Sequence, residues 1–371
     1  MRGSEFPRAV GGFTLTVAIA AAVALSYRPA HALSFVFSPD PSRPPPPVEV
    51  MAAFVAAGRL WSGIFSDDVT VNIRVAFFDF RVDPSLPDNA LGTTSFDTDN
   101  DGYLDAFTYL PSPSSGAPAT YYLAIVSALN QDATSPADMA KLQVLQTGPN
   151  YNRVVNLTSD HPNGSGNPLP YLDTADYNDG VFATHANLKA LGLRNADDPA
   201  LDGVIRFNSF VPNWDFDRTN GIATGSRDFI ATAAHEIAHV LGFKSEIDVV
   251  ENLLVGSSMP LSDDWLAASM MDLFRFSDDF PNIPDITIDP EPEYFRLSGG
   301  QAAVLCNSLA LPGGCQASHW ADNLGLGLMD PTGDNGRINT ISPNDIELLD
   351  VIGWTLHEGR PNPPTDVRVL P

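Results

Sequence analysis

Apolar residues recur with two periods along the chain, and each period predicts one type of secondary structure. Helical spacing of apolar residues over 49–65, 121–130 and 136–145 predicts three helices. Alternation with period two over 69–75 predicts a strand, and the apolar stretch 203–207 predicts another. Because 44% of the 371 residues are hydrophobic, the chain can bury a large core. With both helices and strands predicted, we expect an α+β fold.

The two ends of the chain differ in composition from the region between them. Residues 1–32 combine early arginines, a short apolar stretch and an Ala-x-Ala pattern ending at Ala32, which is typical of a secretory signal peptide. A buried N-terminal helix is the alternative. Proline-rich residues 33–47 predict an extended linker, and residues 359–371 an extended tail. We therefore expect a secreted protein, either extracellular or periplasmic.

The charge balance is strongly acidic and narrows the classes of partner. The chain has 20 Lys and Arg against 45 Asp and Glu, a net charge of −25. Nucleic acid is not expected as a partner, because phosphate binding needs a basic surface. No segment of the mature chain has the apolar length of a stable membrane span. We expect a soluble, self-repelling protein that is a monomer.

Two cysteines enclose a short loop near the C-terminal end. Cys306 and Cys315 flank residues 307–314, which include the turn-forming sequence Pro312-Gly313-Gly314. In an oxidising compartment they are expected to form a disulfide, with two reduced, buried thiols as the alternative. Closing so short a loop stabilises the fold by roughly 2–3 kcal/mol in the chain-entropy model.

Residues 227–242, with the sequence RDFIATAAHEIAHVLG, carry the most specific chemical signal. Their apolar residues recur at helical spacing, so His235 and His239 lie one turn apart and can bind one metal ion. Glu236 is then placed to accept a proton from a metal-bound water without being a ligand itself. The alternative is that both are ordinary surface histidines, with their hydrogen bonds satisfied and no metal bound.

The ends of this helix are also marked in the sequence. Ser226 is the expected N-cap, and Gly242 is expected to end the helix in a left-handed conformation. A catalytic zinc takes three protein ligands, so one more residue is needed. Glu246, Glu251 and Asp272 are carboxylate candidates on later segments.

The stretch from His235 to Gly242 matches the start of the metzincin motif, whose third histidine follows three residues after the glycine. Here that position is Ser245, a poor zinc ligand. The chain instead resembles the leishmanolysin-like branch of this clan, in which a long insertion precedes the third histidine and a methionine turn. That resemblance implies that His319 is the third ligand and Met329 the methionine of the turn.

The resemblance also implies an architecture and an activity. It implies a two-lobed, metzincin-like α+β zinc peptidase with a mixed sheet, an N-terminal catalytic lobe over 48–242 and a C-terminal lobe over 243–358. The activity implied is zinc-dependent endopeptidase cleavage of protein or peptide substrates, with Glu236 as general base. The wider chain is similar to secreted bacterial metalloproteases in stretches 202–210 and 342–354. Ser342 predicts the cap of a final helix there.

A second candidate metal site lies in an acidic stretch. Asp97, Asp99, Asp101 and Asp105 occupy positions 1, 3, 5 and 9 of a loop like that of an EF-hand, with Gly102 at the turn. The position of the bidentate glutamate is taken by threonine. A calcium site and a solvated acidic turn both remain open.

Two further functions are compatible with the sequence. One is a secreted, calcium-stabilised binding or matrix protein whose histidine site is vestigial, which would be favoured if His319 lay far from His235 and His239. The other is a zinc hydrolase that acts on a bond other than a peptide. A peptidase needs an edge strand beside the zinc to pair with an extended substrate.

Overall fold

The computed structural model describes most of the region between the expected signal peptide and the expected tail. Both of these predicted segments, 1–32 and 359–371, lie outside the described residues. The described ranges are 33–100, 104–109, 121–156, 169–174, 178–256, 266–297 and 303–358.

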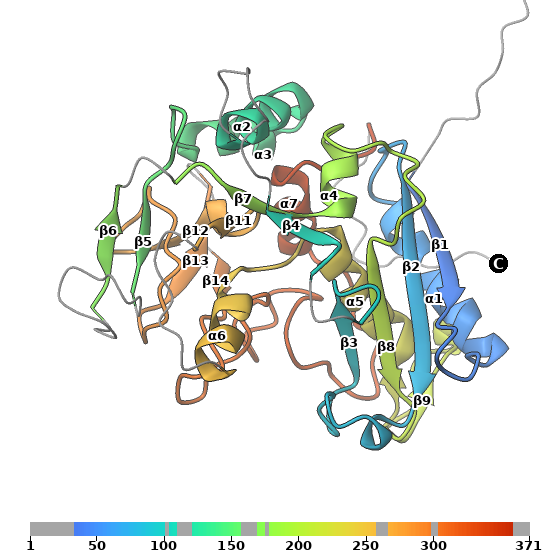
Figure 1. The fold of residues 1–371 in the computed structure, drawn as a ribbon. Coiled ribbons are helices and arrows are strands. Elements are labelled where there is room, and N and C mark those ends of the chain that lie inside the picture. The colour runs from blue at the N-terminus through green and yellow to red at the C-terminus, as the bar shows by residue number, and fades with distance from the viewer. Residues whose placement is uncertain are drawn as a thin grey trace, which may run out of the picture. The chain divides into compact units, whose positions relative to one another are not determined.

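The largest sheet has four strands, which are β1 (Ser34–Pro39), β2 (Thr70–Phe78), β8 (Gly203–Asn208) and β3 (Gly92–Ser95). Their order is β1-β2-β8-β3 (Figure 1). The first three run parallel, whereas β3 is antiparallel to β8, so the sheet is mixed as predicted. The strands predicted over 69–75 and 203–207 are confirmed as β2 and β8.

Strand β1 corrects the prediction that residues 33–47 are a linker. The aromatic residues Phe35 and Phe37 alternate with polar or exposed positions, and both lie against helix α1 (Val48–Ser62). A Cβ atom at Gly58 of α1 would lie 3.0 Å from the ring of Phe35, so the glycine permits this close approach. The proline density of the segment begins only where β1 ends, and it concealed the strand period in the preceding residues.

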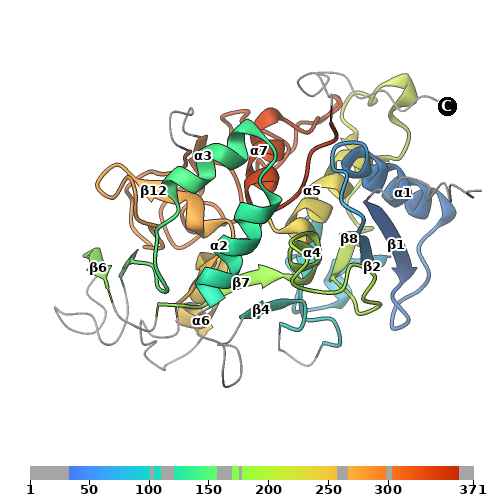
Figure 2. The same ribbon diagram turned by 90° about the horizontal axis from the view of Figure 1, so that it is seen from above.

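Helices α1 and α5 (Phe229–Leu241) pack together on one face of the four-stranded sheet (Figure 2). The ring of Phe54 on α1 makes edge-to-face contacts with Phe229 of α5 and Phe207 of β8. The indole of Trp61 donates a hydrogen bond of 2.9 Å to the carbonyl of Ala234. Helix α5 therefore packs against both the sheet and α1, within the main core.

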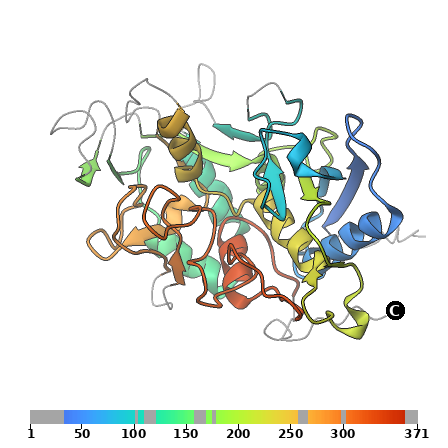
Figure 3. The same cartoon turned by 90° about the horizontal axis from the view of Figure 1, so that it is seen from below.

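The remaining helices cover other parts of the core. Helices α2 (Tyr121–Asp132) and α3 (Pro136–Val144) confirm two predicted helices, and α7 (Pro343–Val351) confirms the predicted final helix with its Ser342 cap. Helices α3 and α7 lie side by side (Figure 3), joined by the buried hydrogen bond from Ser135 to Asp350. The others are α4 (His185–Ala190), α6 (Ile247–Gly256) and the 3-10 turns η1 (Phe80–Val82), η2 (Arg218–Asn220) and η4 (Asp272–Phe274).

Short strands form several smaller sheets, which sequence reasoning did not predict. One has the order β11-β7-β4 and another the order β12-β13-β14. Two pairs complete the set, β5 with β6 and β9 with β10. Their bounds are β4 (Phe107–Tyr109), β5 (Arg153–Val155), β6 (Tyr171–Asp173), β7 (Val181–Thr184), β9 (Trp214–Asp215), β10 (Arg227–Asp228), β11 (Ala268–Ser269), β12 (Arg275–Ser277), β13 (Glu293–Phe295) and β14 (Ala303–Leu305).

Helices and several separate sheets together confirm the α+β class. The metzincin-like architecture and a boundary between lobes at 242 and 243 stay predictions. Among the described helices, none has both the length and the apolar character needed to cross a membrane.

Candidate metal centre

Helix α5 presents the two histidines of the HExxH stretch. It begins two residues later than predicted, because residues 227 and 228 form strand β10, and the N-cap is Asp228 rather than Ser226. The Asp228 side chain accepts a hydrogen bond of 3.0 Å from the backbone of Ala231. Gly242 ends the helix with a φ of 122°, as predicted. At that φ a side chain would be strained, and its Cβ would also lie 2.8 Å from Ile352.

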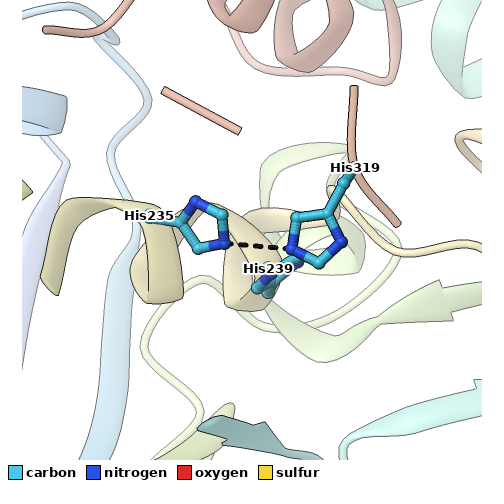
Figure 4. A group of neighbouring side chains, drawn as sticks. All are labelled: His235, His239 and His319. Atoms are coloured by element: carbon cyan, nitrogen blue, oxygen red, sulfur yellow. Dashed lines mark hydrogen bonds between the residues drawn. The ribbon is translucent and has the colours of Figure 1, made fainter. Parts of the chain in front are cut away.

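Three histidine rings converge beside this helix (Figure 4). The Nε2 atoms of His235 and His319 are 3.1 Å apart, although the two residues are distant in sequence. The ring centroids of His239 lie 4.9 Å from those of His235 and 5.0 Å from those of His319. One ring nitrogen from each residue lies within 4.8 Å of those of the other two. His319 therefore joins the helical pair, as the resemblance implied.

The other nitrogen of each ring is held by a backbone carbonyl. The Nδ1 atoms of His235, His239 and His319 lie 2.9, 2.7 and 3.2 Å from the carbonyl oxygens of residues 328, 243 and 316. A carbonyl can only accept, so each Nδ1 carries the proton and each Nε2 keeps a free lone pair. This is the arrangement in which a histidine binds a metal through Nε2.

His239 and His319 are buried and His235 is half-buried, and this burial keeps the imidazoles neutral. Burial lowers the pKa of His235 to about 3, with the neighbouring His319 adding to the effect. Burial also lowers the pKa of His239 well below its usual value, and that of His319 is lowered as well. Neutral imidazole is the form that coordinates a metal, so no proton has to be displaced at neutral pH.

The cluster fits a small divalent cation. Two unprotonated nitrogens 3.1 Å apart repel each other unless a cation lies between them. Tetrahedral zinc, with bonds of about 2.0–2.1 Å, spaces its ligand nitrogens by roughly 3.3–3.4 Å. Three imidazoles also leave a fourth position for water or substrate, as in catalytic zinc sites. The donor set therefore fits zinc.

The rival carboxylates have other partners or lie outside the group. Asp272 accepts hydrogen bonds from the Ser245 hydroxyl and from the backbone of Glu246, and Glu251 accepts one from Ser308. Within the described residues, the group around the three rings contains only histidines. The Ser245 hydroxyl donates its hydrogen bond to Asp272, at 2.7 Å.

Glu236 is buried on the side of α5 that faces the edge strand β3. Its Oε2 accepts a hydrogen bond of 2.7 Å from the hydroxyl of Thr94. A Cβ atom at Gly92 would lie 3.0 Å from its Oε1, so the glycine leaves room for the carboxylate. Burial raises the pKa of Glu236 to about 7, and the hydrogen bond from Thr94 acts in the opposite direction. Sequence reasoning did not find either strand residue, because only the tertiary fold brings them to the helix.

Met329 is fully buried, and the segment around it is fixed by Asp345 of α7. The carboxylate of Asp345 accepts hydrogen bonds from the backbones of Leu328 (2.7 Å) and Met329 (3.1 Å) and from the indole of Trp320 (2.8 Å). Since the Leu328 carbonyl contacts His235, Asp345 supports the cluster indirectly. The role of Met329 as a Met-turn residue stays a prediction. The Ser342 cap of α7 was predicted from the sequence, but these contacts of Asp345 were not.

The predicted disulfide is confirmed. Cys306 and Cys315 are bonded, with their Cα atoms 5.3 Å apart. The backbone N–H of Cys306 donates a hydrogen bond of 3.0 Å to the carbonyl of His319. The disulfide loop is thus attached directly to the residue that completes the cluster.

The acidic stretch forms a second, more exposed group. Carboxylate oxygens of Asp97, Asp99 and Asp105 lie within 4.8 Å of one another. Asp105 accepts hydrogen bonds from the backbone and hydroxyl of Thr98. Asp101 and Gly102 lie outside the described residues, so calcium binding here stays a prediction.

Comparison of the chain with protein-family models, with curated proteins and with solved structures finds no match. Any function assigned to the chain must therefore come from the geometry of its own residues.

Proposed function

We propose that the protein is a secreted zinc-dependent endopeptidase. The observation that carries this proposal is the convergence of His235, His239 and His319 at the helix that also carries the buried carboxylate of Glu236. The three Nε2 atoms would hold the metal. Bound zinc would supply Lewis acidity, which lowers the pKa of a water molecule and polarises a carbonyl group.

Glu236 then acts as general base and general acid. One of its carboxylate oxygens takes a proton from the attacking water and later delivers it to the nitrogen of the leaving amine. Thr94 orients the carboxylate through its hydrogen bond of 2.7 Å to Oε2. The absence of a side chain at Gly92 leaves room for the carboxylate beside β3.

Strand β3 supports a peptide as the substrate. It is the last strand of its sheet among the described residues, and it lies directly beside α5 (Figure 1). An extended peptide can add to such an edge through backbone hydrogen bonds, with its scissile carbonyl near the histidines. This feature favours a peptidase over a zinc hydrolase of another bond.

The other functions predict different features. A vestigial site in a binding or matrix protein was favoured by a distant His319, whereas the His235–His319 nitrogen distance is 3.1 Å. Secretion is supported by the signal-like composition of residues 1–32 and agrees with the disulfide. Calcium at the acidic loop would add stability and no chemistry.

The test compares zinc content and casein cleavage in wild type and in Glu236→Ala. The variant should keep about one zinc per chain and lose cleavage by at least about 100-fold, as expected for a general base. Glu49→Gln, at the exposed start of α1, is the control and should cleave like wild type. Full cleavage by Glu236→Ala would exclude Glu236 as the base.

A further inference from the structure

The segment that carries His319 is held between two buried side chains of opposite charge. On one side, Asp248 of α6 accepts a hydrogen bond of 2.8 Å from the backbone of Ala317 and another from the Ser318 hydroxyl. On the other side, Arg275 of β12 donates a hydrogen bond of 2.7 Å to the carbonyl of Ala317. The backbone N–H and C=O groups of Ala317, two residues before His319, are therefore both held by buried side chains.

Resting on the proposed function, with His319 as a zinc ligand, we propose that Asp248 is the positioning residue of the third ligand. His319 is separated from His239 by residues 240–318, so helical spacing cannot place it. Asp248 fixes the position of His319 through tertiary contacts instead. It acts through Ala317 and Ser318 and does not touch the metal itself.

The residues just after the zinc helix connect the ligands. The carbonyl of Phe243 accepts the hydrogen bond from His239, at 2.7 Å. The backbone of Ser245 donates a hydrogen bond of 2.9 Å to the Ser318 hydroxyl, beside His319. Ser245 occupies the position of the third histidine in the shorter motif. In this chain, therefore, Ser245 is not itself the third ligand but anchors the segment that carries His319.

The charges around Asp248 also resist movement of the segment. Lys244 donates to Asp248 at 3.0 Å from the turn after α5, so the carboxylate links α6 to the end of the zinc helix. Arg275 is itself paired with Glu293 and Asp272 and also donates to the carbonyl of Cys306 at 2.9 Å. A shift of residues 316–319 would leave several of these buried groups without partners, which is costly.

The test measures zinc affinity by chelator competition on the purified full chain, for wild type, Asp248→Ala, Asp248→Asn and His319→Ala. Residues that orient metal ligands typically contribute 10–100-fold to affinity, and Asp248→Ala should lose about that much. Asp248→Asn should lose less, because its amide oxygen can still accept from Ala317. Unfolding of the zinc-free proteins in urea gives the stability of each variant independently of the metal.

Asp202→Ala is the matched control. Asp202 is buried like Asp248 (0% against 4% exposed), pairs with Lys189 at 2.7 Å and accepts a backbone hydrogen bond of 2.7 Å from Asn72. Like Asp248, it has a lysine partner and a backbone partner, but neither belongs to residues 316–319. Asp202→Ala should therefore lower stability and leave the zinc affinity of the folded protein near that of wild type.

The outcomes separate the two proposals. The positioning role is overturned if His319→Ala loses zinc affinity while both Asp248 variants bind zinc as tightly as Asp202→Ala. The proposed ligand set fails instead if His319→Ala itself keeps the affinity of wild type. If Asp248→Ala does not fold, Asp248→Asn and Ser318→Ala decide the question, since each must weaken zinc binding measurably.

Discussion

The histidine cluster and the acidic loop are both candidate metal sites in which residue spacing gave the first signal, yet the structure builds them differently. The three histidines come from two distant segments, are buried except for the half-buried His235, and have their second ring nitrogens fixed by backbone carbonyls. The carboxylates of Asp97, Asp99 and Asp105 come from one loop and are partly or fully exposed, and those of Asp97 and Asp105 accept hydrogen bonds from backbone groups of that same loop. One site is organised by the core and the other by its own turn.

This difference has a physical consequence for metal binding. Neutral imidazoles in a packed core carry no net charge, so their positions are set by the fold before a metal binds. Exposed carboxylates at close range repel one another, and water screens that repulsion only in part. We therefore expect tight, specific binding at the histidines and weak, cation-dependent ordering at the loop.

The largest effect expected is the loss of zinc from His319→Ala. Removing one of three protein ligands should abolish stoichiometric zinc at neutral pH and casein cleavage with it, as measured by metal analysis after dialysis. The control is His357→Ala, because His357 lies near the carbonyl of Ser62 and away from the cluster. If the His319→Ala protein retains one tightly bound zinc per chain, His319 is not the third ligand.

Replacement of Thr94 should have a smaller effect, confined to catalysis. Thr94→Val deletes the hydrogen bond to Glu236 and should lower kcat by roughly 10–100-fold, the value of a hydrogen bond to a charged group. Zinc content should be unchanged, and Thr94→Ser should recover most of the rate. If Thr94→Val cleaves as fast as wild type, the contact does not orient Glu236.

The smallest effect concerns the acidic loop and is a change in stability. Calcium at about 100 times its Kd should stabilise the protein by about 2.7 kcal/mol, seen as a higher Tm. Asp99→Asn should remove most of this increase, whereas Asp334→Asn, an exposed carboxylate elsewhere, should keep it. Equal calcium shifts in the two variants would mean that the loop is only a solvated turn.

Local features of both sites could be predicted, because short-range geometry determines them. The spacing of His235 and His239 on a helix requires no knowledge of the tertiary fold, and the same holds for the glycine at 242. The contribution of His319 came from a resemblance and not from any local pattern. Two local predictions were wrong: Ser226 lies before a short strand, and residues 34–39 form a strand.

The residues that support the cluster could not be predicted, because no short-range geometry determines where they lie. Thr94, Asp248, Arg275 and Asp345 lie on four different elements, and only packing brings them to the histidines or to Glu236. Each resembles an ordinary surface or capping residue in the sequence. Buried charge-assisted contacts depend on distant partners, which no local period encodes.

The most direct test is zinc K-edge X-ray absorption on the purified wild-type protein loaded with one equivalent of zinc. The account predicts three imidazole ligands with Zn–N distances of about 2.0–2.1 Å and one further light-atom ligand. A spectrum with fewer than three imidazoles would contradict it, since the cluster of His235, His239 and His319 would then not be the zinc site.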